Sequence, residues 1–146
     1  MNLSRSNQGC AMLTIEIPFV AGKQSPRSTA NGRSYRAPKC QANGDAIAAA
    51  LGAQAIPDGP LVVVIEAWKK APRKSDIGKA CVTKPDGDNI AKLIQDALIS
   101  DDQRVAGLIV VKCYGTEEKT RIRIFPLEPG LAFQLFNAGA PVTIGC

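Results

Sequence analysis

An amphipathic segment between two long apolar runs constrains the fold of this chain more than any other feature. The run at 61–67 is apolar apart from Glu66 and is followed by Trp68 and two lysines, which is typical of a buried strand. The run at 105–114 predicts a second, central strand. Between the runs, the apolar residues follow the i, i+3, i+4, i+7, i+8 spacing of one helix face: Ile90, Leu93, Ile94, Ala97 and Leu98. This part of the chain is therefore expected to fold as strand, helix and strand.

Shorter patterns complete the predicted order of elements. Apolar residues alternate over 13–19, which predicts a half-buried strand closed by a proline. Residues 20–44 are rich in Gly, Ser, Pro and basic side chains and are expected to be loop, and the Ala-rich stretch 45–53 predicts a short helix. Arginine alternates with isoleucine over 119–125, which predicts a half-exposed strand stopped by Pro126. The resulting order predicts a small α/β (α+β mixed) domain with helices packed on one mixed sheet.

The length and composition fit a single folded domain. The chain has 146 residues, of which 45% are hydrophobic and 21% charged, as in globular proteins. We expect a flexible N-terminal segment over 1–11, a folded domain over 12–126 and a C-terminal extension of unknown role over 127–146.

The absence of histidine from the whole sequence excludes several kinds of active site. Triads built on histidine, zinc sites of the H-E-x-x-H type and imidazole general bases all need that side chain. Any chemistry must therefore use carboxylates, lysine, tyrosine, hydroxyls, thiols or a metal held by oxygen ligands.

The cysteines and the apolar runs indicate a cytoplasmic protein. The five cysteines are widely spaced without a C-x-x-C pair, so we expect reduced thiols and neither a zinc site nor a disulfide framework. Glu16 and Pro18 interrupt the early apolar stretch, which argues against a signal peptide. No apolar run approaches the roughly 20 residues of a membrane span, so no membrane partner is expected.

Basic residues are concentrated in two segments on either side of the run at 61–67. The net charge is +5, which favours a polyanionic partner because neutralising phosphates releases counterions. Six Lys or Arg against one acid precede residue 41, and another six against one acid occupy 69–84. We identify the second set as candidate DNA-binding residues: Lys69, Lys70, Arg73, Lys74, Lys79 and Lys84. A solvated surface loop is the alternative, and the commoner fate of such a run.

Acidic residues cluster directly after the second basic segment. Five of the thirteen acids lie between 86 and 102, namely Asp86, Asp88, Asp96, Asp101 and Asp102. Asp88 and Asn89 are favourable N-cap types, so the helix is expected to begin there. The i, i+4 spacing then puts Asp88, Lys92 and Asp96 on one polar strip, away from the apolar stripe.

Carboxylates from separate parts of the chain, with a lysine between them, suit Mg²⁺ or Mn²⁺. Such hard cations take oxygen ligands, keep several waters and often use few protein carboxylates. Lys92 would then hold the phosphate or the leaving oxygen as a point charge. The structural alternative is an N-cap, ordinary i, i+4 pairs and a turn. An EF-hand is excluded because its register from Asp86 puts Ala97 at the bidentate glutamate, and the spacing before Gly78 and Lys79 excludes a P-loop.

The stretch from residue 84 to residue 125 resembles the RusA family of Holliday junction resolvases. The family has a helix motif, D-x-D-N-x-x-K-x-x-x-D-x-L, and residues 84–98 are similar to it with the sequence K-P-D-G-D-N-I-A-K-L-I-Q-D-A-L. In the family this motif is followed by a D-D-x-Q-V pattern, and residues 101–105 are similar to that pattern with the sequence D-D-Q-R-V. The upstream match is looser and includes N-G-R-S-Y at 31–35. Two departures concern geometry: Gly87 replaces the usual apolar residue between the two aspartates, and the connection to Asp101 is short.

The resemblance implies a RusA-like nuclease domain over 12–126, an intertwined homodimer that resolves four-way DNA junctions with Mg²⁺, and a bacterial or phage origin. By this resemblance, Asp86, Asp88 and Asp102 match the metal-binding, catalytic aspartates, and Lys92 matches the essential lysine. Asp101 is a further candidate metal ligand. A dimer also follows from symmetry, because paired nicks need two active sites related by a two-fold axis.

Two other functions fit parts of the sequence. A non-catalytic protein that binds branched DNA would need the basic segments, although binding alone would favour losing the acidic cluster. A metal-dependent phosphatase acting on a small substrate would need the carboxylates, but the basic segments are oversized for such a ligand. Cleavage of a four-way junction, a duplex and a nucleotide with Mg²⁺ separates the three.

Overall fold

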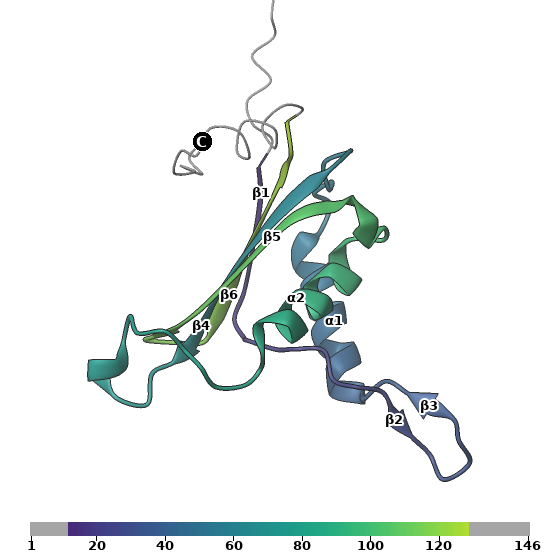
Figure 1. The fold of residues 1–146 in the computed structure, drawn as a ribbon, viewed down its shortest axis with the longest axis horizontal. Coiled ribbons are helices and arrows are strands. Elements are labelled where there is room, and N and C mark those ends of the chain that lie inside the picture. Colours follow the sequence, from purple (N-terminus) through teal and green to yellow (C-terminus); the bar gives the residue numbers. More distant parts are fainter. Residues whose placement is uncertain (1–11, 129–146) are drawn as a thin grey trace, which may run out of the picture.

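A computed structural model describes residues 12–128, which form a four-stranded mixed sheet with two helices on one face (Figure 1). The strands are β1 (Leu13–Ile17), β6 (Lys119–Pro126), β4 (Leu61–Lys70) and β5 (Val105–Gly115), in that order across the sheet. β6 runs antiparallel to both β1 and β4, whereas β4 and β5 are parallel. The small mixed α/β domain predicted from the sequence is confirmed. Residues 1–11 and 129–146, which hold the expected N-terminal segment and most of the expected extension, lie outside the described residues.

The strands β1 and β6 show the alternation of buried and exposed side chains that the sequence predicts. In β1, the three apolar residues Leu13, Ile15 and Ile17 are buried and their neighbours are exposed. In β6, Ile122 and Ile124 are fully buried, and the alternating Arg121 and Arg123 point to the opposite face of the sheet. One face of the sheet therefore belongs to the core, and the other carries charged side chains.

β5 is an edge strand, so the prediction of a central strand over 105–114 is wrong. The two inner positions belong to β6 and β4, and Leu61, Val63 and Ile65 of β4 are fully buried. β5 pairs only with β4, and its Leu108 and Val111 are 44% and 50% exposed. An apolar run indicates that its side chains favour burial, but it does not indicate whether the strand pairs with one neighbour or with two.

The first helix, α1 (Pro38–Leu51), begins well before the predicted stretch 45–53. Pro38 occupies a favourable first-turn position, because its missing N–H has no partner in a first turn. Cys40 and Ile47 are buried in the core, and this packing outweighs the helix cost of the glycine between them. The predicted loop 20–44 also contains a small hairpin of β2 (Arg27–Ser28) and β3 (Ser34–Tyr35), which projects from the domain in Figure 1.

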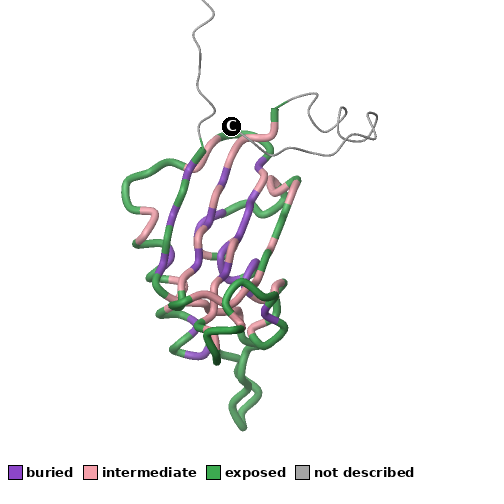
Figure 2. The backbone as a smooth tube through the Cα atoms, turned by 90° about the vertical axis from the view of Figure 1, so that its left-hand side faces the viewer, coloured by how far each residue is buried: buried purple, intermediate pink, exposed green. Residues whose placement is uncertain are grey.

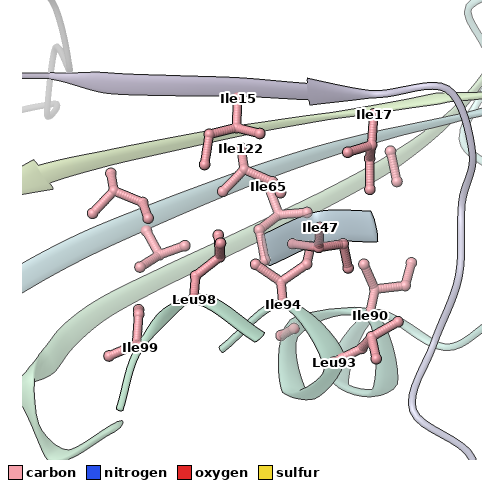
Figure 3. Packing of buried hydrophobic residues seen from close by; sticks show 14 of the residues in the cluster. Ile15, Ile17, Ile47, Ile65, Ile90, Leu93, Ile94, Leu98, Ile99 and Ile122 are labelled. Atoms are coloured by element: carbon pink, nitrogen blue, oxygen red, sulfur yellow. The ribbon is translucent and has the colours of Figure 1, made fainter. Parts of the chain in front are cut away.

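The second helix, α2 (Gly87–Leu98), presents the predicted apolar stripe to the sheet. Figure 3 shows its Ile90, Ile94 and Leu98 directed toward isoleucines of the strands, with Ile47 of α1 beside them. The helix begins at Gly87 with Asp86 as its N-cap, so the prediction of a start capped by Asp88 or Asn89 is wrong by two or three residues. Asp88 lies instead inside the first turn, where a negative charge also suits the helix dipole.

The connections carry most of the exposed residues (Figure 2). Two short 3-10 turns lie in them: η1 (Lys74–Asp76) within the basic segment and η2 (Asp102–Arg104) between α2 and β5. Neither helix of the described residues is both long enough and apolar enough to cross a membrane.

Candidate active site

The candidate site is built around residues 83–86, here called the 83–86 turn, which lead from the basic segment into α2. The Lys84–Pro85 peptide bond is cis, and Asp86 follows it in an extended conformation. The Asp86 carbonyl accepts the Ile90 N–H at 3.1 Å, which starts the helix. The carboxylates of Asp86 and Asp88 are both exposed at this end of α2, as a ligand for a metal or a substrate must be.

Lys92 lies one helical turn after Asp88 and pairs with it. The Lys92 Nζ donates to the Asp88 Oδ2 at 3.2 Å, and the two side chains are 59% and 64% exposed. This hydrogen bond lowers the pKa of the Asp88 carboxyl, which therefore stays ionised at neutral pH. Because both groups face water, the pair contributes little to folding and leaves the ammonium accessible to substrate.

The remaining predicted ligands lie at the opposite end of α2. The helix has 12 residues, and a helix of that length spans about 18 Å. Asp101 accepts the Gln103 N–H at 3.2 Å and caps η2, and Asp102 is the first residue of that turn. Within residues 12–128 of one chain, no three His, Cys, Asp or Glu lie close enough together to hold a metal ion. The structure therefore brings Asp86 and Asp88 together and leaves Asp101 and Asp102 apart from them.

The polar strip in the sequence suggested that Asp96 lies with Asp88 and Lys92, but Asp96 forms its ion pair with another lysine. Its Oδ2 lies 2.5 Å from the Nζ of Lys23, which comes from the segment after β1. The backbone N–H of Lys23 also donates to the Asn89 carbonyl at 2.8 Å. These contacts hold the segment after β1 against α2, a long-range arrangement for which helical spacing carries no signal.

Gly22 allows this segment to approach the 83–86 turn. A Cβ atom at this position would lie 2.8 Å from the Cβ of Pro85 and 3.1 Å from that of Asn89. Any other residue would therefore push the segment away from the turn. Sequence reasoning missed Gly22, because a lone glycine in a predicted loop has no distinguishing pattern.

A cavity of about 620 Å³ opens beside Asp86, between the segment after β1, α1 and the start of α2. Three lysines line it, namely Lys23, Lys39 and Lys84. Its size lies within the range of ordinary ligand sites. These ammonium groups suit the phosphate of a substrate, and the Asp86 carboxylate that also lines the cavity suits a cation that bridges to it.

The predicted DNA-binding residues divide into two groups in the structure. Lys69 donates to the Lys84 carbonyl at 2.6 Å, and Lys79 pairs with Asp76 at 2.9 Å. The other four are exposed and have no carboxylate partner among the residues that the structure describes: Lys70, Arg73, Lys74 and Lys84. These four are the members of the set with charge available for phosphates.

Lys112 is a neighbour of the site that the prediction of site residues did not include. Its Nζ donates to the carbonyls of Thr83 and Pro85, at 2.8 Å each. The sequence contains one signal for it: Lys112 follows Leu108 and Val110 at a spacing of two, on the strand face directed toward the helices.

The site combines carboxylates at the start of α2, a lysine-lined cavity and a basic loop, and this set of groups suits the phosphate esters of a nucleic acid. The profile of the family described as Endodeoxyribonuclease RusA matches residues 17–125. The chain belongs to this endodeoxyribonuclease family, which confirms the resemblance, and membership implies action on Holliday junctions. No curated protein matches the chain at a significant level.

Proposed function

We propose that the chain is a divalent-metal-dependent resolvase that cuts a four-way DNA junction by paired phosphodiester hydrolysis in a homodimer. One observation carries the proposal: the family match over 17–125 contains all the predicted catalytic residues, which are Asp86, Asp88, Lys92 and Asp102. The decisive assay compares a labelled four-way junction, a duplex and a nucleotide with Mg²⁺. Cleavage of the nucleotide alone would favour a phosphatase, and binding of the junction without cleavage would favour a non-catalytic protein.

The donor set fits Mg²⁺ or Mn²⁺. Asp86 and Asp88 are exposed carboxylates two residues apart, and Mg²⁺ is often held by one or two carboxylates together with waters and substrate phosphate. Asp102 and Asp101 would add oxygen ligands from the other end of α2. When bound, the ion would neutralise charge on the scissile phosphate and lower the pKa of the attacking water.

The chain's own residues have distinct tasks in this proposal. Lys39 and Lys84, which line the cavity beside Asp86, would hold backbone phosphates of the strand to be cut. Lys92 would place its ammonium next to the oxygens that gain charge as water adds to phosphorus and the P–O bond breaks. Its pairing with Asp88 keeps that ammonium at the carboxylate end of α2.

The homodimer supplies what one copy lacks. Because α2 separates Asp86 from Asp102, a metal site that uses both would take Asp86 and Asp88 from one copy and Asp102 from the other. The exposed edge strand β5 supports association, since Leu108, Ile109 and Val111 present apolar surface there. A two-fold dimer of this kind contains two such sites, one for each strand to be cut.

Mixed dimers are expected to reveal this sharing. We predict that Asp86→Asn and Asp102→Asn are each inactive alone, whereas their mixture, after exchange of subunits, nicks one strand of the junction. The mixed dimer would contain one site with both substitutions and one site with neither. Nicked and fully resolved products are separated on denaturing and native gels.

The matched control is a mixture of Asp86→Asn with Asp88→Asn, which should stay inactive. These two residues lie at the same end of α2, so every site in the mixed dimer has lost one of them. Failure of the first mixture to recover, with subunit exchange verified, would place each site within a single copy.

Binding to the junction is expected to weaken steeply with salt through the basic segment. The slope of log affinity against log salt is about −0.9 for each phosphate neutralised on duplex DNA. We predict that Lys70→Gln combined with Lys74→Gln makes this slope shallower by up to about two units. Fluorescence anisotropy over a range of salt concentrations measures it, with Lys119→Gln on the charged face of the sheet as control. An unchanged slope would make the segment an ordinary solvated loop.

A further inference from the structure

Two lysine ammonium groups from strands of the sheet donate hydrogen bonds to the backbone of the 83–86 turn. Lys69 of β4 donates to the Lys84 carbonyl at 2.6 Å, and Lys112 of β5 donates to the carbonyls of Thr83 and Pro85 at 2.8 Å each. Three successive backbone acceptors, over residues 83–85, therefore take their hydrogen bonds from two lysines of neighbouring strands. Turns usually satisfy such groups with water or with their own backbone.

Lys112 is placed for this contact by the strand. It lies on the face of β5 that carries Val110, whose Cγ1 would be 3.4 Å from a Cβ at Gly87, the first residue of α2. Its ammonium has no carboxylate partner within residues 12–128, so the two carbonyls are its partners there. An exposed lysine that bound DNA would instead direct its charge away from the protein.

We propose that Lys112 is a positioning residue that fixes the backbone of Asp86, an inference that rests on the proposed function. The Pro85 carbonyl belongs to the same rigid peptide plane as the Asp86 nitrogen. On the other side, the Asp86 carbonyl is held by the Ile90 N–H at 3.1 Å. The Cα of Asp86 thus lies between two peptide groups that are both held, which fixes the direction of its Cα–Cβ bond and so limits the region that its carboxylate can reach.

Loss of this contact affects geometry more than folding. The Thr83 carbonyl belongs to an exposed residue and that of Pro85 to a half-buried one, so water can replace the ammonium at both. The turn would then sample several conformations around Asp86. A misplacement of about 1 Å in a catalytic constellation can cost on the order of 10²-fold in rate.

The test compares Lys112→Met and Lys112→Arg with Lys119→Met, which removes an ammonium from the charged face of the sheet, 5.1 Å from the centroid of Trp68. For Lys112→Met we expect kcat at saturating Mg²⁺ to fall by on the order of 10²-fold. The KM for the junction and the unfolding temperature should stay near wild type. Lys112→Arg, which keeps charged donors in a different geometry, should recover part of kcat, and Lys119→Met should cleave normally.

A second readout avoids activity altogether. Calorimetric titration with Mn²⁺ in the absence of DNA should show that Lys112→Met binds the ion more weakly than the wild type, whereas Lys119→Met binds it with wild-type affinity. If Lys112→Met does not fold, the test uses Lys112→Arg, for which the proposal predicts a smaller loss of kcat at unchanged KM.

Three results would overturn the inference. These are a wild-type kcat in Lys112→Met, a loss confined to KM, or a loss of kcat only in proportion to a lowered unfolding temperature. Asp86→Asn separates this failure from that of the proposed function. If Asp86→Asn is inactive and Lys112→Met is normal, only the positioning role is wrong, whereas normal cleavage by Asp86→Asn removes the site itself.

Discussion

Asp86→Asn, Asp88→Asn and Asp102→Asn are each expected to abolish cleavage of a four-way junction at saturating Mg²⁺, while binding of the junction survives or strengthens. Each substitution replaces an anionic oxygen ligand by a neutral amide, which a hard cation binds poorly. Each also removes a negative charge that repels DNA. The loss of rate should be on the order of 10³-fold or more, because both charge neutralisation and activation of water depend on the ion.

Single-turnover cleavage beside a binding assay measures the two effects separately. Asp45→Asn is a matched control, since Asp45 is an exposed aspartate of α1 whose side chain accepts a hydrogen bond from Gln41 at 2.9 Å. The control should cleave normally. Near-wild-type cleavage by any of the three site variants would remove that residue from the proposed site, and simultaneous loss of binding would indicate a folding defect in place of a lost ligand.

Lys92→Met is expected to fold normally, to dimerise and to bind the junction, but to cleave it on the order of 10²–10³-fold more slowly. The alternative role for Lys92 is an exposed i, i+4 pair with Asp88, and such pairs contribute little to stability. A purely structural lysine would therefore leave turnover almost unchanged. A catalytic one would lower it by orders of magnitude at nearly the same unfolding temperature.

The conservative variant sharpens this prediction. Lys92→Arg should restore little activity, because a planar guanidinium does not replace the compact ammonium that pairs with the Asp88 carboxylate. Gln41→Met is the control, since it removes the side-chain contact of Gln41 with Asp45, four residues later on α1. Thermal melts and single-turnover rates are compared for all three variants. A Lys92→Met protein that melts early but cleaves normally at low temperature would show that the pair with Asp88 is its only role.

Local periodicity was sufficient to predict several elements of the fold. The apolar stripe of α2 faces the core as its spacing requires, because helical geometry places i, i+3 and i+4 on one side. The alternation in β1 and β6 likewise predicted which side chains are buried, since successive residues of a strand point to opposite faces. The same local geometry placed Asp88 and Lys92 on one polar strip of α2, where the structure pairs them.

Tertiary structure decided everything that depends on contacts between distant segments. Strand order is set by which edges pair, so β5 lies at the edge of the sheet although its sequence is as apolar as that of a central strand. Spacing along the chain could not show whether the segment after α2 turns back toward Asp86, because that depends on how the helix end packs, and the structure leaves Asp102 at the far end of the helix. Nor could it show that Lys112 binds the backbone next to Asp86, since charge in a sequence does not reveal whether a lysine meets solvent, a phosphate or a carbonyl. Periodicity therefore determined the faces of the elements, and burial of those faces against each other determined which residues meet.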